Sequence, residues 1–172
     1  YRPARERSTA KISSMVEAEL QNTGYDEASL LSLSTGDYSE IEPLLTGLMC
    51  GLSQEHVSMS LPSLRVGTLS KALATEVARV RKTGFTIAPE AGTERLRMVI
   101  NKGISEADLI TTAETVFSLG WRAIKLYFMV GLPTETEEDL LGIVNLGARV
   151  RQAGKRVMKG APQVSVSVTT FI

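Results

Sequence analysis

Cysteine and histidine are almost absent from this chain. Its 172 residues include one cysteine, Cys50, and one histidine, His56. One cysteine excludes an internal disulfide, and the two residues together cannot complete a four-ligand zinc site or hold an iron–sulfur cluster. Cys50 stands among apolar residues of an expected helix, so we interpret it as a packing residue. We interpret His56 as a helix-end or loop residue.

The chain also lacks an excess of charge and any long apolar run. Its 19 basic residues balance 19 acidic ones, which argues against binding nucleic acid by bulk electrostatics. The arginines at positions 2, 5 and 7 have Glu6 among them, which is typical of a solvated loop. No apolar run approaches the ~20 residues of a membrane span, and no signal peptide opens the chain. We therefore expect a cytoplasmic protein with no membrane partner.

Apolar periodicity predicts that strands and helices alternate along the chain. The expected strands cover residues 30–35, 57–61, 85–89, 123–130 and 164–171; the expected helices cover residues 8–22, a stretch beginning near 39, 70–82, 93–100, 105–119 and 136–151. Ser39 and Glu42 suggest a capping box for the second helix, and Asp108 and Asp139 occupy capping positions in the last two. Hairpin signals are absent, so the strands should be parallel.

Three of these strands alternate apolar and hydroxyl residues, at 31–34, 57–61 and 164–169. Such a strand packs its apolar face under helices, and the hydroxyl face suits a barrel interior that holds a polar ligand. The alternative is an edge strand that faces water. We predict an α/β fold, a partial TIM-like (β/α)6 barrel of parallel strands, here strands two to six. Five strands do not close a barrel, so we expect residues 1–172 to be an incomplete domain, with a strand missing before Tyr1 and the remainder missing downstream.

Ligands of parallel α/β folds bind at the carboxyl ends of the strands. There, Asp37 could accept from an ammonium or a ribose hydroxyl, Arg65 could pair with a carboxylate, and Glu90 could accept from a ribose diol. The backbone of residues 129–131 could bracket an adenine. A phosphate is disfavoured, because the following helix opens with carboxylates at 135 and 137–139 that already satisfy its positive end. The pattern favours a neutral or zwitterionic nucleoside.

Several segments together resemble the radical S-adenosylmethionine (SAM) enzymes. Residues 86–97 and 100–103, which include Ala-Pro-Glu-Ala-Gly and Ile-Asn-Lys-Gly, resemble the fourth-strand segment of that family. Residues 126–139 resemble its fifth-strand signature, and residues 34–37 stand where the family carries a Gly-Gly-Glu-like motif. The domain is similar to the one shared by methylthiotransferases and the Elongator catalytic subunit. Residues 1–8 resemble the segment that follows the cluster-binding loop in a subfamily with a cobalamin-binding-like region upstream.

The resemblance implies that SAM lies across the strand ends. A [4Fe–4S] cluster would cleave it reductively to a 5′-deoxyadenosyl radical. The implied contacts are Gly36 and Asp37 to the methionine amino group; Ser60 and Arg65 to its carboxylate or the ribose, with Arg95 as an alternative carboxylate partner; Glu90 to the ribose; and Met129, Val130 and Gly131 to the adenine. Asp37 stands in place of the commoner glutamate, which shortens its reach.

The family's Cys-x3-Cys-x2-Cys loop is absent from this chain, and the resemblance implies that it lies just upstream of Tyr1. The chain alone is therefore expected to be inactive. For the parent protein, the resemblance implies an electron donor such as flavodoxin or ferredoxin, raises cobalamin as a further cofactor, and leaves RNA, protein and small molecules open as substrates. Two alternatives are a non-catalytic nucleoside-binding barrel module and a barrel enzyme acting on a phosphorylated metabolite.

Overall fold

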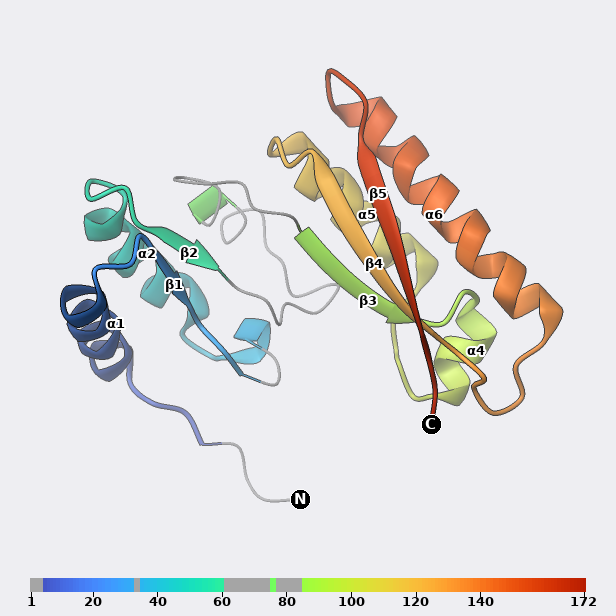
Figure 1. Ribbon diagram of the computed structural model, residues 1–172, viewed down its shortest axis with the longest axis horizontal. Helices are drawn as coiled ribbons and strands as arrows, with labels where there is room; N and C mark the ends of the chain where they lie inside the picture. Colours follow the sequence, from blue (N-terminus) through green and yellow to red (C-terminus); the bar gives the residue numbers. More distant parts are fainter. Residues whose placement is uncertain (1–4, 33–34, 61–74, 77–84) are drawn as a thin grey trace. The chain divides into compact units, whose positions relative to one another are not determined.

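The computed structural model describes residues 5–32, 35–60, 75–76 and 85–172. The chain divides into two compact units, each of which is described by itself. The first unit contains α1, α2 and the parallel pair β1–β2; the second contains the sheet β3-β4-β5 with α4, α5 and α6 (Figure 1). None of the described helices is long and apolar enough to cross a membrane.

The first unit opens with α1 (Thr9–Thr23), whose ends follow from local chemistry. Ser8 caps the helix by accepting from the Lys11 amide at 3.3 Å, which satisfies one of the free amides of the first turn. The helix ends at Gly24, which adopts a left-handed φ of 70° that glycine tolerates without steric cost. The predicted helix and its glycine stop are confirmed to within one residue.

The second helix, α2 (Ile41–Leu52), buries the predicted apolar stripe but begins differently from the prediction. Its buried residues are Ile41, Leu44, Leu45, Leu48, Met49 and Leu52. The capping box from Ser39 and Glu42 is wrong, because the residue before the helix is Glu40 and no side chain caps it. Ser39 instead donates two hydrogen bonds to the Glu6 carboxylate, from its amide at 3.0 Å and from its hydroxyl at 2.6 Å.

The first strand, β1 (Glu27–Ser29), pairs in parallel with β2 (Ser58–Ser60). The prediction of a strand over 30–35 is wrong, since pairing with β2 ends when the Leu30 amide donates to the Ser60 carbonyl at 3.1 Å. Beyond that bond Leu31 is 77% exposed, so its alternation with serine belongs to a loop. The expected helix over 70–82 lies outside the described residues, apart from 75–76.

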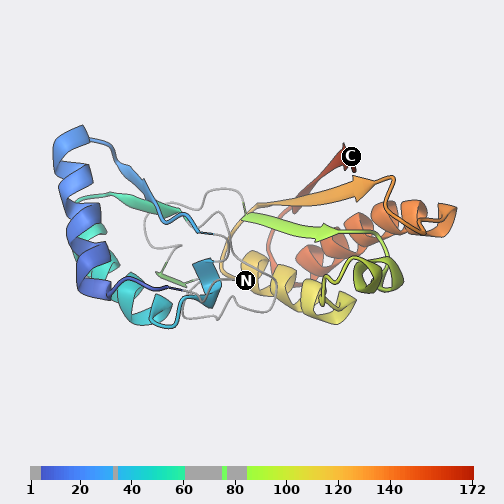
Figure 2. The ribbon, with the colours of Figure 1, turned by 90° about the horizontal axis from the view of Figure 1, so that it is seen from below.

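In the second unit, β4 is the central strand of a three-stranded parallel sheet. Its strands are β3 (Phe85–Glu90), β4 (Ala123–Val130) and β5 (Gln163–Thr170), and its helices are α4 (Glu94–Val99), α5 (Glu106–Ser118) and α6 (Glu137–Val157). All three helices lie on one side of the sheet (Figure 2). Ile124, Leu126 and Phe128 of β4 are fully buried. The helix α6 runs past the predicted end at 151, because Ala153 and Gly154 are still buried.

The edge strand β5 shows how its two faces differ. A Cβ on Gly147 of α6 would lie 3.3 Å from a methyl carbon of Val166, so the valines of β5 face α6. Ser165, Ser167 and Thr169 alternate with these valines and therefore lie on the opposite face of the sheet, away from the three helices. The protein thus has an α/β fold of parallel sheets and helices, consistent with a partial TIM-like barrel.

Candidate functional site

The carboxyl end of β3 carries an unusual glutamate. Glu90 is the last residue of the strand and has φ of 71°, a left-handed conformation that non-glycine residues rarely adopt. The register with β4 is irregular between Ile87 and Glu90. The Glu90 carboxylate accepts a hydrogen bond from the Lys102 ammonium at 3.2 Å, and the two side chains are 25% and 30% exposed. Strain of this kind is common at functional sites, where the surrounding structure has to enforce it.

Sequence reasoning missed Lys102 as a site residue. The short helix α4 ends at Val99, Ile100 is its C-cap, and Asn101 then turns the chain with a φ of 56°. The Lys102 amide donates to the Arg97 carbonyl at 2.8 Å, and the side chain returns to Glu90. The available signal was Asn101, one of the few residues besides glycine that enter the left-handed region readily. The Ile-Asn-Lys-Gly segment therefore places a cation next to the carboxylate at the end of β3.

The end of β4 lies beside the end of β3 and is largely apolar. Met129 packs against the buried cluster of Ala91, Leu96 and Leu132. The Val130 carbonyl accepts from the Phe171 amide at 2.8 Å, and the Gly131 amide donates to the Glu135 carboxylate at 2.8 Å. These two backbone groups already have partners, so Met129 and Val130 offer a flat ligand mainly apolar contact.

A buried carboxylate joins α4 to the start of α6. Asp139 is 2% exposed and accepts from Thr93, from the Thr136 amide at 2.9 Å and hydroxyl at 2.7 Å, and from Arg95. Burial acts to raise the pKa of Asp139, but the hydrogen bonds from Thr93, Thr136 and Arg95 outweigh it and hold that pKa well below its usual range. Arg95 also donates to the Thr134 carbonyl at 2.8 Å. The predicted carboxylate partner Arg95 is thus paired with a carboxylate of the protein itself.

The turn after β3 lies directly against α6, backbone on backbone. A Cβ on Gly92 would come within 2.5 Å of the Ile143 amide nitrogen and 2.7 Å of the Gly142 carbonyl carbon. A Cβ on Gly142 would in turn lie 2.9 Å from the Gly92 carbonyl carbon. Gly92 is therefore needed for helix packing, and its contact with α6 fixes the chain two residues after Glu90.

Three predicted site residues belong to the first unit. Gly36 and Asp37 lie in the 3-10 turn η1 (Thr35–Asp37), and Ser60 is the last residue of β2. The buried Thr35 anchors this turn by donating to the Leu30 carbonyl at 3.2 Å, just after β1. The described predicted residues thus form two groups. These three lie at the carboxyl ends of β1 and β2, and the others lie in or just after β3, α4 and β4. Arg65 lies outside the described residues.

The residues of this chain do not fit an iron–sulfur cluster. Cys50 is its one cysteine, and it is exposed on α2, so its interpretation as a packing residue is wrong. Within the described ranges, no three or more histidine, cysteine or acidic side chains gather closely enough to hold a metal ion. A nucleoside fits better, because the end of β3 and β4 combines a carboxylate, an ammonium and apolar side chains.

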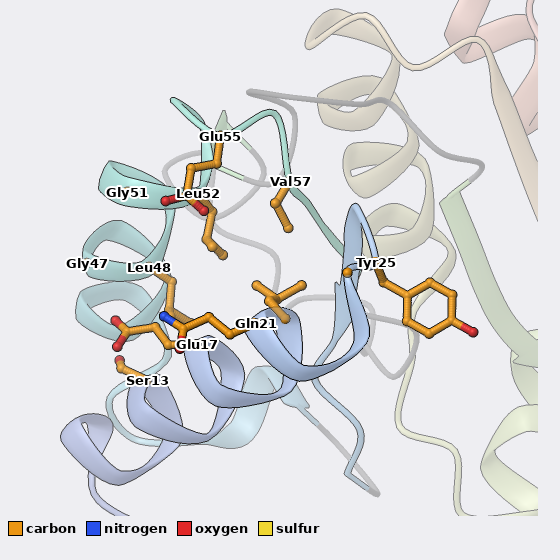
Figure 3. A pocket seen from close by; sticks show the side chains of 12 residues that line it. Ser13, Glu17, Gln21, Tyr25, Gly47, Leu48, Gly51, Leu52, Glu55 and Val57 are labelled. Atoms are coloured by element: carbon orange, nitrogen blue, oxygen red, sulfur yellow. The ribbon is translucent and has the colours of Figure 1, made fainter.

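A separate hollow of about 390 Å³ lies in the first unit, between α1 and α2 (Figure 3). Glu17 and Gln21 line it from α1, and Gly47 and Gly51 from α2. Val57, which directly precedes β2, lies at its end, so the hollow is near the amino ends of the strands. None of the predicted site residues lines it. The hollow is therefore distinct from the strand-end site.

Comparison with known proteins identifies the family. The family model of the radical SAM superfamily matches residues 1–147. An uncharacterized protein of Methanocaldococcus jannaschii is 35% identical over 172 residues, which are 100% of this chain and 36% of the relative. The chain thus spans about a third of the length of this curated relative. The strand-end motifs, the parallel α/β fold and the match over most of the chain agree, and the chain belongs to the radical SAM superfamily.

Proposed function

We propose that this chain binds S-adenosylmethionine and forms the cofactor-binding part of a radical SAM enzyme. The observation that carries the proposal is the Glu90–Lys102 pair, since Glu90 has a strained conformation at the carboxyl end of a parallel strand. Ligands of such sheets bind at this end of the strands. A strained acidic residue there, only partly exposed and already paired with a cation, is better explained by ligand binding than by stability.

The chemistry of these groups matches a nucleoside. The Glu90 carboxylate is an acceptor for ribose hydroxyls, and the Lys102 ammonium has three donors, of which one is used by Glu90. Met129 and Val130 provide apolar contact for the adenine ring, because the Val130 carbonyl and the Gly131 amide already have partners. The adenine would therefore be bound mostly by its faces, with its orientation set by the ribose.

For the methionine end of the cofactor, we propose the residues that the family resemblance implies. Gly36 and Asp37 would contact the amino group, and Ser60 and Arg65 would contact the carboxylate or the ribose. Arg95 takes a different role in this proposal. Its guanidinium is bonded to Asp139 and Thr134, so it would position α4 and contact the ligand at most indirectly.

We further propose that the parent protein is the active enzyme and that the chain alone is inactive. In this family, a bound [4Fe–4S] cluster supplies reductive cleavage of S-adenosylmethionine to a 5′-deoxyadenosyl radical. Its cysteine ligands would come from sequence outside this chain. Residues 1–172 would be one part of a larger barrel domain, and cobalamin, a flavodoxin or ferredoxin electron donor, and a cytoplasmic location belong to the same proposal. Its substrate would be RNA, a protein or a small molecule.

Two alternatives make different predictions. A non-catalytic nucleoside-binding module has the same strand-end site but no cluster-binding cysteines in the full-length protein. It predicts nucleoside binding without cleavage in the full-length protein. A barrel enzyme for a phosphorylated metabolite would need free amides where β4 leads into α6. This reading is weakened because the Gly131 amide is bonded to Glu135 and the Thr136 amide to Asp139.

Calorimetric titration of the full-length protein tests the proposed function. Adenosine and S-adenosylhomocysteine are the probes, because both lack the sulfonium group and are not cleaved, so the titration measures binding alone. Glu90→Gln removes the charge but keeps the size, and should weaken binding by roughly tenfold to a hundredfold, the value of a charged hydrogen bond. Glu55→Gln is the matched control, since Glu55 is exposed and is not among the proposed contacts. Equal binding by wild type and Glu90→Gln, or tight competition by inorganic phosphate, would contradict the proposal.

A further inference from the structure

Arg97, on α4, is a charged residue with no exposed surface. Its relative exposure is 0%, and it is the largest fully buried side chain of the described part of the chain. Its Nε donates to the Ile104 carbonyl at 2.9 Å and its Nη1 to the Ala91 carbonyl at 3.0 Å. The Nη2 has no partner among the described residues, and none of the ion pairs described there includes Arg97.

Stability alone does not explain this side chain. Burying a guanidinium without a carboxylate is costly, and an apolar residue of similar size would fill the same space more cheaply. Burial lowers the pKa of Arg97, and only the charge of Glu94 acts against this. The two acceptors of Arg97 are main-chain carbonyls of two different turns, so its guanidinium holds backbone in place.

The held backbone flanks both members of the Glu90–Lys102 pair. Ala91 directly follows Glu90, and its carbonyl is bound by Nη1. On the other side, Ile104 follows Lys102 by two residues, and its carbonyl is bound by Nε. The main-chain carbonyl of Arg97 accepts from the Lys102 amide at 2.8 Å. One residue therefore connects the turn that carries the carboxylate with the turn that carries the ammonium.

We infer that Arg97 is a positioning residue of the nucleoside site. By binding the Ala91 and Ile104 carbonyls together, it holds Glu90 in its left-handed conformation and Lys102 within reach of the Glu90 carboxylate. This role rests on the proposed function of the end of β3. It requires the forked guanidinium, which donates in two directions at once, whereas a lysine donates from a single atom.

A double-mutant cycle on the full-length protein tests this role. The variants are Arg97→Met, Glu90→Gln and the double variant, with Arg97→Lys as the conservative change and Arg151→Met as an exposed control. Calorimetric titration with adenosine gives the dissociation constants, and thermal unfolding gives the stability of each variant. Because Arg97 would act through Glu90, Arg97→Met should weaken adenosine binding about tenfold alone and have little further effect in the Glu90→Gln background.

The possible outcomes are distinct. Wild-type binding, weaker binding by Arg97→Met and by Arg97→Lys, which lacks the fork, and non-additivity of either with Glu90→Gln support the role. Additive losses, or an Arg97→Met protein that is less stable but binds adenosine like wild type, overturn it and leave the proposed function intact. If Arg97→Met does not fold, Arg97→Lys carries the same cycle, and additivity there overturns the role. Failure of wild type to bind either adenosine or S-adenosylhomocysteine refutes the proposed function and this role with it.

Discussion

Gly92→Ala is the substitution for which the structure predicts the sharpest effect. The new Cβ would lie within 2.5 Å of the Ile143 nitrogen and 2.7 Å of the Gly142 carbonyl carbon, with the Asp139 carbonyl oxygen closer still. All three are backbone atoms of α6, so no side chain can rotate away to make room. The turn after β3 would have to move away from α6.

The size of the effect follows from these distances. Overpacking of a core by one methyl group costs about 1–3 kcal/mol when neighbours can adjust. Here the neighbours are main-chain atoms of one helix, so we expect a loss at or above the upper end, about 3 kcal/mol. Gly103→Ala is the matched control, since nothing lies within 4 Å of its new Cβ and its φ is not in the left-handed region. It should change the free energy of unfolding by no more than about 0.5 kcal/mol.

Urea unfolding of the full-length protein, followed by circular dichroism, measures both variants. The domain that contains β3 and α6 should unfold at a clearly lower urea concentration in Gly92→Ala, without a change in slope. Adenosine binding should weaken as well, because Glu90 stands two residues before the displaced position. If Gly92→Ala were as stable as Gly103→Ala, the turn after β3 would not pack against the backbone of α6 as closely as described.

Three further predictions concern single residues. Asp139→Asn should destabilise the protein by about 2–4 kcal/mol through lost charge-assisted bonds and a weakened helix cap. Because the folded-state pKa of Asp139 is lowered, its contribution to stability is fully present above an unfolded pKa of about 4 and is lost as the pH falls through the lower folded-state value. The difference in unfolding free energy between wild type and Asp139→Asn should therefore narrow between pH 6 and pH 3 in urea titrations, and a constant difference would contradict this cause. Gly131→Ala should lower the free energy of unfolding by about 1–2 kcal/mol. The cause is the φ of 84° and not a clash, since the nearest atom to the new Cβ is 3.9 Å away. An unchanged melting temperature would contradict the left-handed turn. Cys50→Ser should leave stability within about 0.5 kcal/mol, because Cys50 is exposed. It should also leave the iron content of the reconstituted full-length protein unchanged, because Cys50 belongs to no potential metal-binding group among the described residues; loss of iron would make it a ligand.

Helix starts were predictable where capping is local. Ser105 and Asp108 form the capping box of α5, and Thr136 and Asp139 that of α6. The failure at α2 has a clear cause, since Ser39 is bound by Glu6, 33 residues away in the sequence. A pattern of neighbouring residues contains no information about such a partner.

Strands were predictable except at the first position. The bounds of β4 agree with the prediction at both ends, and those of β3 and β5 to within one residue. The first strand was placed three residues too late, because alternation of leucine and serine describes a strand only if a neighbour pairs with it. In the described residues that pairing ends at Leu30.

The sequence is enough to propose where the site lies, but it does not predict the contacts that hold the proposed residues in place. The rule that ligands bind at the carboxyl ends of parallel strands is enough to select Glu90 and Met129–Gly131. It does not select Lys102, whose approach depends on the left-handed turn at Asn101 and on the bond from its amide to Arg97. Nor does it show that the Gly131 amide already donates to Glu135, which removes one backbone donor from the predicted adenine contact.

The strain at Glu90 links the packing of this unit to its proposed function. A left-handed non-glycine residue costs about 1–3 kcal/mol, so Glu90 would return to an extended conformation, with its carboxylate displaced, unless its neighbours prevented it. Three contacts do so: Gly92 is wedged against α6, the Ala91 carbonyl is bound by Arg97, and the carboxylate is bound by Lys102. Each is modest alone, and they act on successive residues of one turn. Removing any one should therefore release the strain and reduce ligand binding by more than the contact's own loss, because the remaining two no longer define a single conformation.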